Sequence, residues 1–283
     1  MGVVSTMKFT LYSPIARFAA YLLLVGAALG TIFPVLWLTA SIFKQSSDII
    51  AHPFALPTSL DLSNLTQAWQ SANFGVLYTN SLLITSVSVV GILIFEGAAA
   101  YAFARLEFPG KNVIFVLFLI GQMVPAQLIL LPSFVEISFL GLTDTKLSLI
   151  LQYLSWAPFA VLFLRASFLA VPVELEEAAI IDGAGRLTLL LRLMLPLTKA
   201  AFATVATMYT LWIWNDFLFP LAYLRSAANY TVPLGLATFQ GLFTTYWGEL
   251  VGAIAIAIWP PMILYLILSR PIQESLATGG LKY

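Results

Sequence analysis

The sequence has few charged residues, no cysteine and a single histidine. Charged side chains make up 9% of the 283 residues, whereas 60% of the residues are apolar. A soluble domain carries about 25% charged residues, so this chain has too few to cover a water-facing surface, and a bilayer must solvate much of it. The lack of cysteine excludes disulfides and thiolate chemistry, and a single histidine, His52, makes a histidine-based metal site implausible.

Two classes of function lack the residues that they need. The formal net charge is zero, whereas a nucleic-acid partner requires a basic surface. ATP hydrolysis requires a phosphate-binding loop of the form G-x-x-x-x-G-K-[ST], but the one Gly-Lys pair, Gly110-Lys111, precedes Asn112 and has no glycine at the needed spacing. We therefore expect no nucleic-acid partner, no enzyme activity and no cofactor, ATP or Mg²⁺ included, bound by this chain itself.

Six apolar stretches are long enough to cross a bilayer, since a helical span needs about 20 apolar residues. They are 18–42, 78–103, 112–132, 148–169, 200–223 and 249–269. The first is too long for the core of a signal peptide, and no Ser-, Pro- or Gly-rich linker divides the chain. The sequence predicts one all-α, polytopic membrane domain with six transmembrane helices over residues 1–283.

Lysine and arginine lie mainly on one side of the predicted spans. Cytoplasmic loops of membrane proteins carry the excess of these residues. With the N-terminus inside, the cytoplasmic side holds Lys8, Arg17, Arg105, Lys111, Arg165, Arg186, Arg192, Lys199, Arg270 and Lys282. The outer side holds only Lys44, Lys146 and Arg225. Both termini are therefore predicted to be cytoplasmic.

The loop 171–196 is the most informative segment. Pro172 starts a helix where its missing N–H costs nothing, and three glutamates follow in the early turns, where the helix dipole favours them. Gly183 and Gly185 interrupt the helix, and a second apolar stretch ends at Pro196. The pattern predicts a cytoplasmic helix–turn–helix.

Either the lipid surface or another protein could cover this helix–turn–helix. Interfacial helices carry a polar face rich in Lys and Arg. The first helix of this loop instead begins with Glu174, Glu176 and Glu177. The composition therefore favours a protein partner.

The same loop resembles the EAA loop of binding-protein-dependent ABC importer permeases. The shared pattern is E-A-A, a glycine four residues after the second alanine, and a proline that closes the second helix. The matching residues are Glu177, Ala178, Ala179, Asp182, Gly183, Ala184, Leu195 and Pro196. In that family the loop is the coupling helix that docks on a cytoplasmic ATPase subunit, and the resemblance implies this role here.

Other stretches resemble the carbohydrate branch of these importers, the maltose-type second permease. They are 99–111, 214–218 with Pro220-Leu221, and 276–282. The chain departs from the pattern at Tyr283, where glycine is common, and at Glu96, in a span that is usually apolar there. The resemblance implies the type I ABC importer transmembrane fold in the cytoplasmic membrane of a bacterium or archaeon. It also implies partners: a second permease subunit, two ATPase subunits that bind ATP and Mg²⁺, and an extracytoplasmic solute-binding protein.

Polar residues within the predicted spans are candidate substrate contacts, because such groups usually face a cavity or a partner. The candidates in the fifth stretch are Trp212, Trp214, Asn215 and Asp216. This cluster suits the hydroxyls and C–H faces of a sugar, and it equally suits an interfacial aromatic anchor. Glu96, beside a patch of small residues, packs against a helix or lines the pathway. Weaker candidates are Gln122, Gln127, Gln152 and Tyr153.

These observations together predict the transmembrane subunit of an ATP-driven importer for a sugar or oligosaccharide. A permease for glycerol phosphate or a polyol is the first alternative. A secondary transporter is the second, and it predicts inverted repeats or broken helices at the midplane of the membrane.

Overall fold

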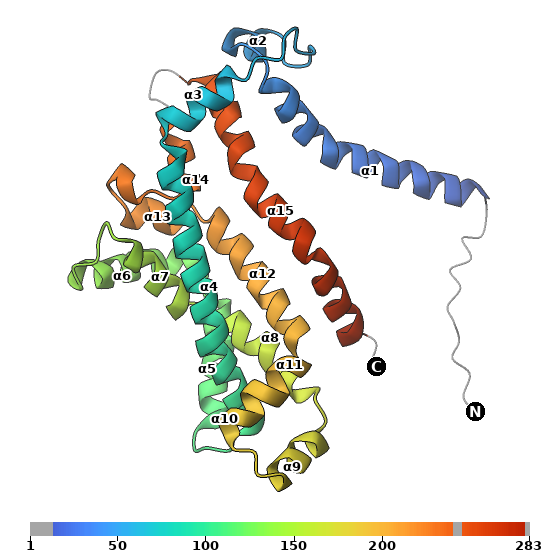
Figure 1. The fold of residues 1–283 in the computed structure, drawn as a ribbon, viewed down its shortest axis with the longest axis vertical. Coiled ribbons are helices and arrows are strands. Elements are labelled where there is room, and N and C mark those ends of the chain that lie inside the picture. Colours follow the sequence, from blue (N-terminus) through green and yellow to red (C-terminus); the bar gives the residue numbers. More distant parts are fainter. Residues whose placement is uncertain (1–13, 240–244, 281–283) are drawn as a thin grey trace.

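The computed structural model describes residues 14–239 and 245–280, and within them it has helices and no strand (Figure 1). The α-helices are α1 (Pro14–Ser41), α2 (Ser46–Ala51), α3 (Ser63–Ser71), α4 (Phe74–Arg105), α5 (Lys111–Met123), α6 (Ala126–Phe139), α7 (Lys146–Ser155), α8 (Pro158–Leu169), α9 (Val173–Ile181), α10 (Arg186–Thr188), α11 (Leu195–Leu197), α12 (Lys199–Asn215), α13 (Leu218–Tyr223), α14 (Val232–Leu236) and α15 (Trp247–Gly280). A π-helix η1 (Leu189–Met194) and two 3₁₀ turns, η2 (Ala227–Asn229) and η3 (Ala237–Phe239), complete the described part. The all-α prediction is confirmed.

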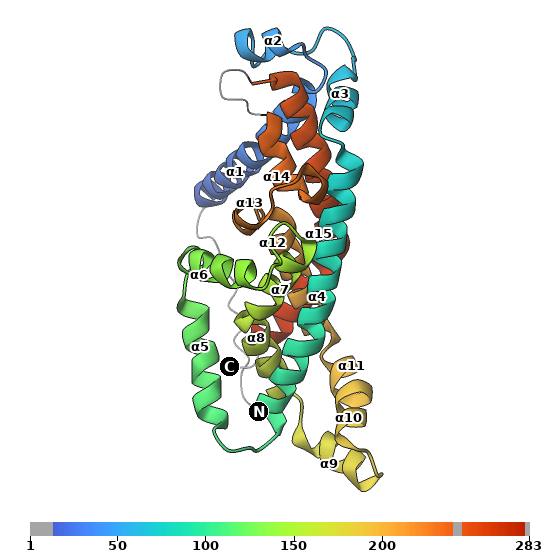
Figure 2. The same cartoon turned by 90° about the vertical axis from the view of Figure 1, so that its left-hand side faces the viewer.

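Helix α4 runs along the length of the bundle, and α7, α8 and α12 pack against it (Figures 1 and 2). Its buried side chains recur every three or four residues: Leu77, Asn80, Ser81, Ile84, Thr85, Ser88, Val89 and Ile92. This spacing keeps them on one face of a helix. Several are small or polar, as is usual where membrane helices approach closely.

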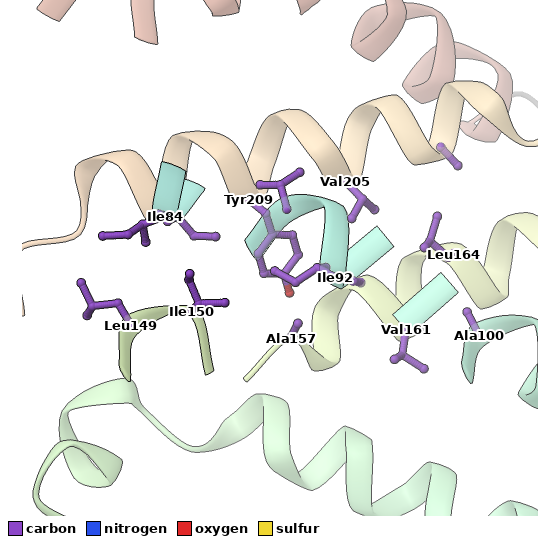
Figure 3. Close-up of a cluster of buried hydrophobic side chains, with 14 of the residues drawn as sticks. Ile84, Ile92, Ala100, Leu149, Ile150, Ala157, Val161, Leu164, Val205 and Tyr209 are labelled. Atoms are coloured by element: carbon purple, nitrogen blue, oxygen red, sulfur yellow. The ribbon is translucent and has the colours of Figure 1, made fainter. Parts of the chain in front are cut away.

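The main apolar core lies between α4, α7, α8 and α12 (Figure 3). Ile92 of α4 and Leu149 of α7 are fully buried there, as are Val161 of α8 and Val205 of α12. Tyr209 of α12 belongs to the same cluster. The four helices are therefore one closely packed unit, and a displacement of one helix is transmitted to the others.

Three of the six predicted spans are each divided between two helices. The stretch 112–132 is divided by a 106° bend between α5 and α6, and 148–169 by a 45° bend between α7 and α8. Pro125 and Pro158 follow these bends, and the residue before a proline is disfavoured in helical conformation. The stretch 200–223 breaks instead at Asp216, whose backbone is extended.

The predicted spans 18–42 and 78–103 coincide with α1 and α4, each long and apolar enough to cross a membrane alone. Three bent pairs would each add one span: α5 with α6, α7 with α8, and the segment 186–197 with α12. The apolar part of α15, Trp247–Ile263, is shorter. The count of six spans and the cytoplasmic termini stay predictions.

The start of α15 lies tightly against α3 at the end of the bundle that α2 occupies. A Cβ atom at Gly252 would stand 2.5 Å from the backbone oxygen of Asn64, and one at Gly248 would strike the Asn64 side chain. Glycines one turn apart allow such close approach of two backbones. The Asn64 amide donates to the carbonyl oxygens of Ile42 (2.7 Å) and Lys44 (2.8 Å), which fixes the chain between α1 and α2 here.

Candidate coupling loop and pathway cavity

The predicted helix–turn–helix is present at one end of the bundle, opposite α2 (Figures 1 and 2). Pro172 caps α9, and the second helix runs through α10, η1 and α11 to Leu197. Pro196 therefore lies in the last turn of that helix. The chain then bends by 79° into α12, so the loop and α12 meet at one joint.

The turn of this loop is a Schellman motif, the usual way to end a helix on a left-handed glycine. Gly183 has φ +85°. Its N–H donates to the carbonyl of Ile180 at 2.9 Å, and the N–H of Ala184 donates to the carbonyl of Ala179 at 2.9 Å. The motif requires the glycine to be the fourth residue after Ala179. This hydrogen-bond pattern is a physical reason for the spacing in the sequence E-A-A-I-I-D-G.

The turn also presents an apolar surface away from the bundle. The side chains of Ile180, Ile181 and Leu187 are 56%, 85% and 68% exposed. Glu177, Ala178, Asp182 and Gly183 are exposed, and Ala179 and Ala184 are half-buried. An exposed apolar patch that polar residues surround usually marks a site of interaction with another protein.

The inner side of α9 is attached to the bundle by an ion pair. Arg105, the last residue of α4, pairs with Glu176. Glu176 is the single buried residue of α9. Nothing in the sequence distinguishes it from the two neighbouring glutamates, so sequence reasoning missed this contact.

A cavity of about 370 Å³ lies at the other end of α12. Its lining is mostly aromatic and polar: Gln152, Tyr153, Trp156, Tyr209, Leu211, Trp212, Ile213, Asn215, Asp216 and Phe219. These residues come from α7, α12, α13 and the breaks that follow α7 and α12. The helix breaks thus open the bundle where polar side chains converge.

Asp216 occupies the break between α12 and α13. Its Oδ2 accepts a 2.7 Å hydrogen bond from the Tyr153 hydroxyl, and its Oδ1 accepts from the backbone N–H of Leu218 at 3.0 Å. An aspartate that bonds the backbone two residues ahead offers the chain an alternative to helix. This bond explains why α12 stops here although no proline follows directly.

The structure separates the predicted pathway residues into two groups. Trp212, Asn215 and Asp216 line the cavity, together with the weaker candidates Gln152 and Tyr153. Trp214 is buried and packs 5.9 Å from the Tyr78 ring. It lines a second cavity of about 330 Å³ with residues of α4 and α15. Gln122 and Gln127 are exposed on α5 and α6.

Glu96 lines neither cavity. It is half-buried in α4, next to Gly97, where a Cβ atom would stand 3.0 Å from the Phe202 ring. This close contact between α4 and α12 agrees with the packing alternative for Glu96. Five lining residues were not foreseen, three of them the aromatic Trp156, Tyr209 and Phe219. An apolar or aromatic residue in a span has no sequence feature that separates a lining position from a core position.

Comparison with known proteins identifies the family. Residues 96–276 match the family described as "Binding-protein-dependent transport system inner membrane component". The chain belongs to this family. It is a transport permease and not an enzyme, and its exposed helix–turn–helix is the EAA loop typical of these permeases. A membrane location and a binding-protein-dependent assembly with an ATPase follow from the same membership.

Individual relatives cover nearly the whole permease. The diacetylchitobiose uptake system permease protein NgcG of Streptomyces coelicolor is 33% identical over 93% of this chain and 89% of its own length. The multiple sugar-binding transport system permease protein MsmG of Streptococcus mutans is 34% identical over 94% of this chain and 97% of its own length. A chain in the crystal structure of a bacterial ABC transporter involved in alginate import superposes with a TM-score of 0.82 at 23% identity. The superposition covers 92% of the present chain and 98% of that chain. The predicted type I importer fold is confirmed.

Proposed function

We propose that this permease is the transmembrane subunit of an ATP-driven importer for a sugar or oligosaccharide, multi-pass in a bacterial or archaeal cytoplasmic membrane. It forms half of the translocation pathway beside a second permease subunit. Two ATPase subunits hold ATP and Mg²⁺, and an extracytoplasmic solute-binding protein delivers the solute. The sugar systems of NgcG and MsmG support the substrate class.

The observation that carries this proposal is the path of α12. One end of α12 follows the EAA loop through a single bend, and its other end, Leu211 to Asn215, lines the cavity. Its 17 residues span about 25 Å at 1.5 Å per residue. A rigid helix of this length transfers a displacement of the loop to the cavity, so ATP-driven closure of the ATPase pair changes access to the pathway.

The chemistry of the cavity suits a sugar. The rings of Trp156, Tyr209 and Trp212 provide apolar faces for C–H groups, and Asn215 and Asp216 offer hydrogen-bond partners to hydroxyls. The lining contains no lysine or arginine that would pair with a phosphate. This composition favours a sugar over a glycerol phosphate. The broken helices by themselves also suit a secondary transporter, and the family match is what favours the ATP-driven importer.

The docking role can be tested by photo-crosslinking, since the chain has no native cysteine. A benzophenone maleimide on Ile181→Cys should crosslink to an ATPase subunit in native membranes. The same label on Leu56→Cys is a matched control, because the two side chains are 85% and 83% exposed at opposite ends of the bundle. An ATPase crosslink from Leu56→Cys and none from Ile181→Cys would refute the proposed docking.

The substrate class is tested separately on the solute-binding protein. We expect its thermal unfolding temperature to rise with neutral di- or oligosaccharides. A rise with glycerol phosphate alone would reject the sugar assignment while leaving the coupling role intact.

A further inference from the structure

One guanidinium group connects three helices at the loop end of the bundle. Arg105 ends α4 and forms the ion pair with Glu176 of α9. Its Nη2 also donates to the carbonyl oxygens of Phe168, at 2.8 Å, and Val171, at 2.5 Å. Phe168 lies in the last turn of α8, and Val171 precedes α9. A single side chain therefore joins α4, the end of α8 and the EAA loop.

This contact is shielded from water. The side chains of Arg105 and Glu176 are only 11% and 9% exposed. A buried charge that loses its partner is left uncompensated, so each member of the pair depends on the other. The planar fork of arginine can bind a carboxylate and carbonyl oxygens together, whereas a lysine ammonium is a compact point charge.

The rest of α9 has little attachment to the bundle. Glu176 is its single buried residue, and its main neighbouring element is η1 in the second half of the same loop. Without the ion pair, α9 would be held by its chain connections and by the loop itself. The charge pair is thus the side-chain link between the docking helix and α4.

We propose that Arg105 and Glu176 are positioning residues that make α9 move as one rigid unit with α4 and α8 during transport. This inference rests on the proposed function, in which an ATPase subunit displaces the loop. It adds a second route beside α12, from the loop into α4, around which α7, α8 and α12 pack. An exposed ion pair could not serve in this way, since such pairs contribute little.

The rigid unit can be measured directly with two spin labels. Glu174→Cys in α9 and Ala166→Cys in α8 are both exposed positions. Distances are recorded on the intact assembly in lipid nanodiscs, at rest and trapped with ATP and vanadate. We expect one narrow distance distribution that is the same in both states. Glu176→Gln or Arg105→Ala should broaden it.

A second readout separates coupling from simple stability. The ATP hydrolysis rate of the reconstituted assembly is measured with and without its solute-binding protein, purified from the same cells. We expect Glu176→Gln and Arg105→Ala to lower the stimulation ratio roughly fivefold or more, the usual size of a coupling between sites. Arg105→Lys, which keeps the charge and loses the fork, should give an intermediate ratio. It also serves as the second variant if the alanine chain does not assemble.

A matched control breaks a nearby ion pair whose carboxylate is exposed. Glu107 and Lys111 are 3.0 Å apart, and the Glu107 side chain is 90% exposed. Glu107→Gln should leave both the distance distribution and the stimulation ratio at native values. A native chain that carries no ATPase subunit would refute the proposed function. A stimulated native assembly whose Glu176→Gln and Arg105→Ala variants keep the native ratio and distribution would refute this inference alone.

Discussion

The hydroxyl of Tyr153 donates a 2.7 Å hydrogen bond to Oδ2 of Asp216, and this bond joins α7 to the break between α12 and α13. The same carboxylate also accepts a hydrogen bond from the N–H of Leu218, and this second bond stabilises the backbone of the break. Residues far apart in the chain thereby shape one wall of the cavity. The Tyr223 hydroxyl donates to Oε1 of Gln152 at 2.6 Å and orients the next lining residue in the same way.

Removal of the Tyr153 hydroxyl should destabilise this region. Tyr153→Phe leaves one oxygen of the half-buried Asp216 carboxylate without its partner, and a hydrogen bond to a charged group contributes about 1.5–3 kcal/mol. We expect a lower thermal unfolding temperature of the purified assembly. Tyr246→Phe is the control, because Tyr246 is 59% exposed. An equal loss in the two variants would contradict the role of the bond.

Gly183 should be the most sensitive glycine of the EAA loop. Its φ of +85° disfavours an L side chain, so Gly183→Ala should cost about 1–2 kcal/mol. Gly183→Pro should uncouple ATP hydrolysis from transport, because proline fixes φ near −65°. Membrane insertion should be preserved in both variants. The measurement is the stimulation of ATP hydrolysis by the solute-binding protein.

Gly185 provides the matched control two residues away. Its φ is −76°, and a Cβ atom there would meet nothing within 4 Å. Gly185→Ala should therefore keep native stimulation. Normal ATP-dependent transport in Gly183→Pro would count against the coupling role of the turn.

The sequence predicted what depends on local pattern. The helix–turn–helix followed from Pro172, the glycines and the spacing around Gly183, and α4 followed from a long apolar run. The Schellman geometry then accounts for that spacing. These features are readable because each is determined by residues within a few positions of one another.

The rest depended on distant contacts. Pro125 and Pro158 did not predict the breaks beside them, since membrane helices tolerate proline when neighbours satisfy the freed groups. The break at Asp216 was missed because an aspartate in an apolar stretch does not by itself reveal its partners, which are the N–H of Leu218 and the hydroxyl of Tyr153, 63 residues away. Trp212 and Trp214 line different cavities because different helices flank the two sides of α12. The periodicity of the sequence alone does not tell which helices these are.

Asp144 should make the loop before α7 and the loop after α13 sensitive to acid. Its carboxylate accepts from the backbone N–H groups of Arg225 (2.9 Å) and Ser226 (3.0 Å) and from the Ser226 hydroxyl (2.7 Å). These hydrogen bonds hold the pKa of Asp144 well below its usual range, and the bond from the Arg225 N–H has the largest effect. A lowered pKa stabilises the fold above the unfolded value of about 3.9, and this contribution is lost as pH falls below it.

The corresponding experiment compares native protein with Asp144→Asn, a neutral mimic whose side chain tolerates the φ of +59° at this position. The native unfolding temperature should exceed that of the variant at neutral pH, and the difference should shrink below about pH 4. A difference that stays constant down to the lowest pH would show that the charge of Asp144 is irrelevant.

Glu96 provides the test between packing and pathway. Acidic groups inside a membrane cost about 2.5–3.5 kcal/mol at the centre of a helix, and Glu96 lies outside both cavities, beside the close contact of Gly97 with Phe202. We therefore expect Glu96→Gln to raise the unfolding temperature and to leave solute uptake into proteoliposomes unchanged. Asp216→Asn, on the cavity, should lower uptake in the same assay. Reduced uptake by Glu96→Gln at unchanged stability would instead place Glu96 on the pathway, which requires a conformation in which α4 turns this carboxylate toward the solute.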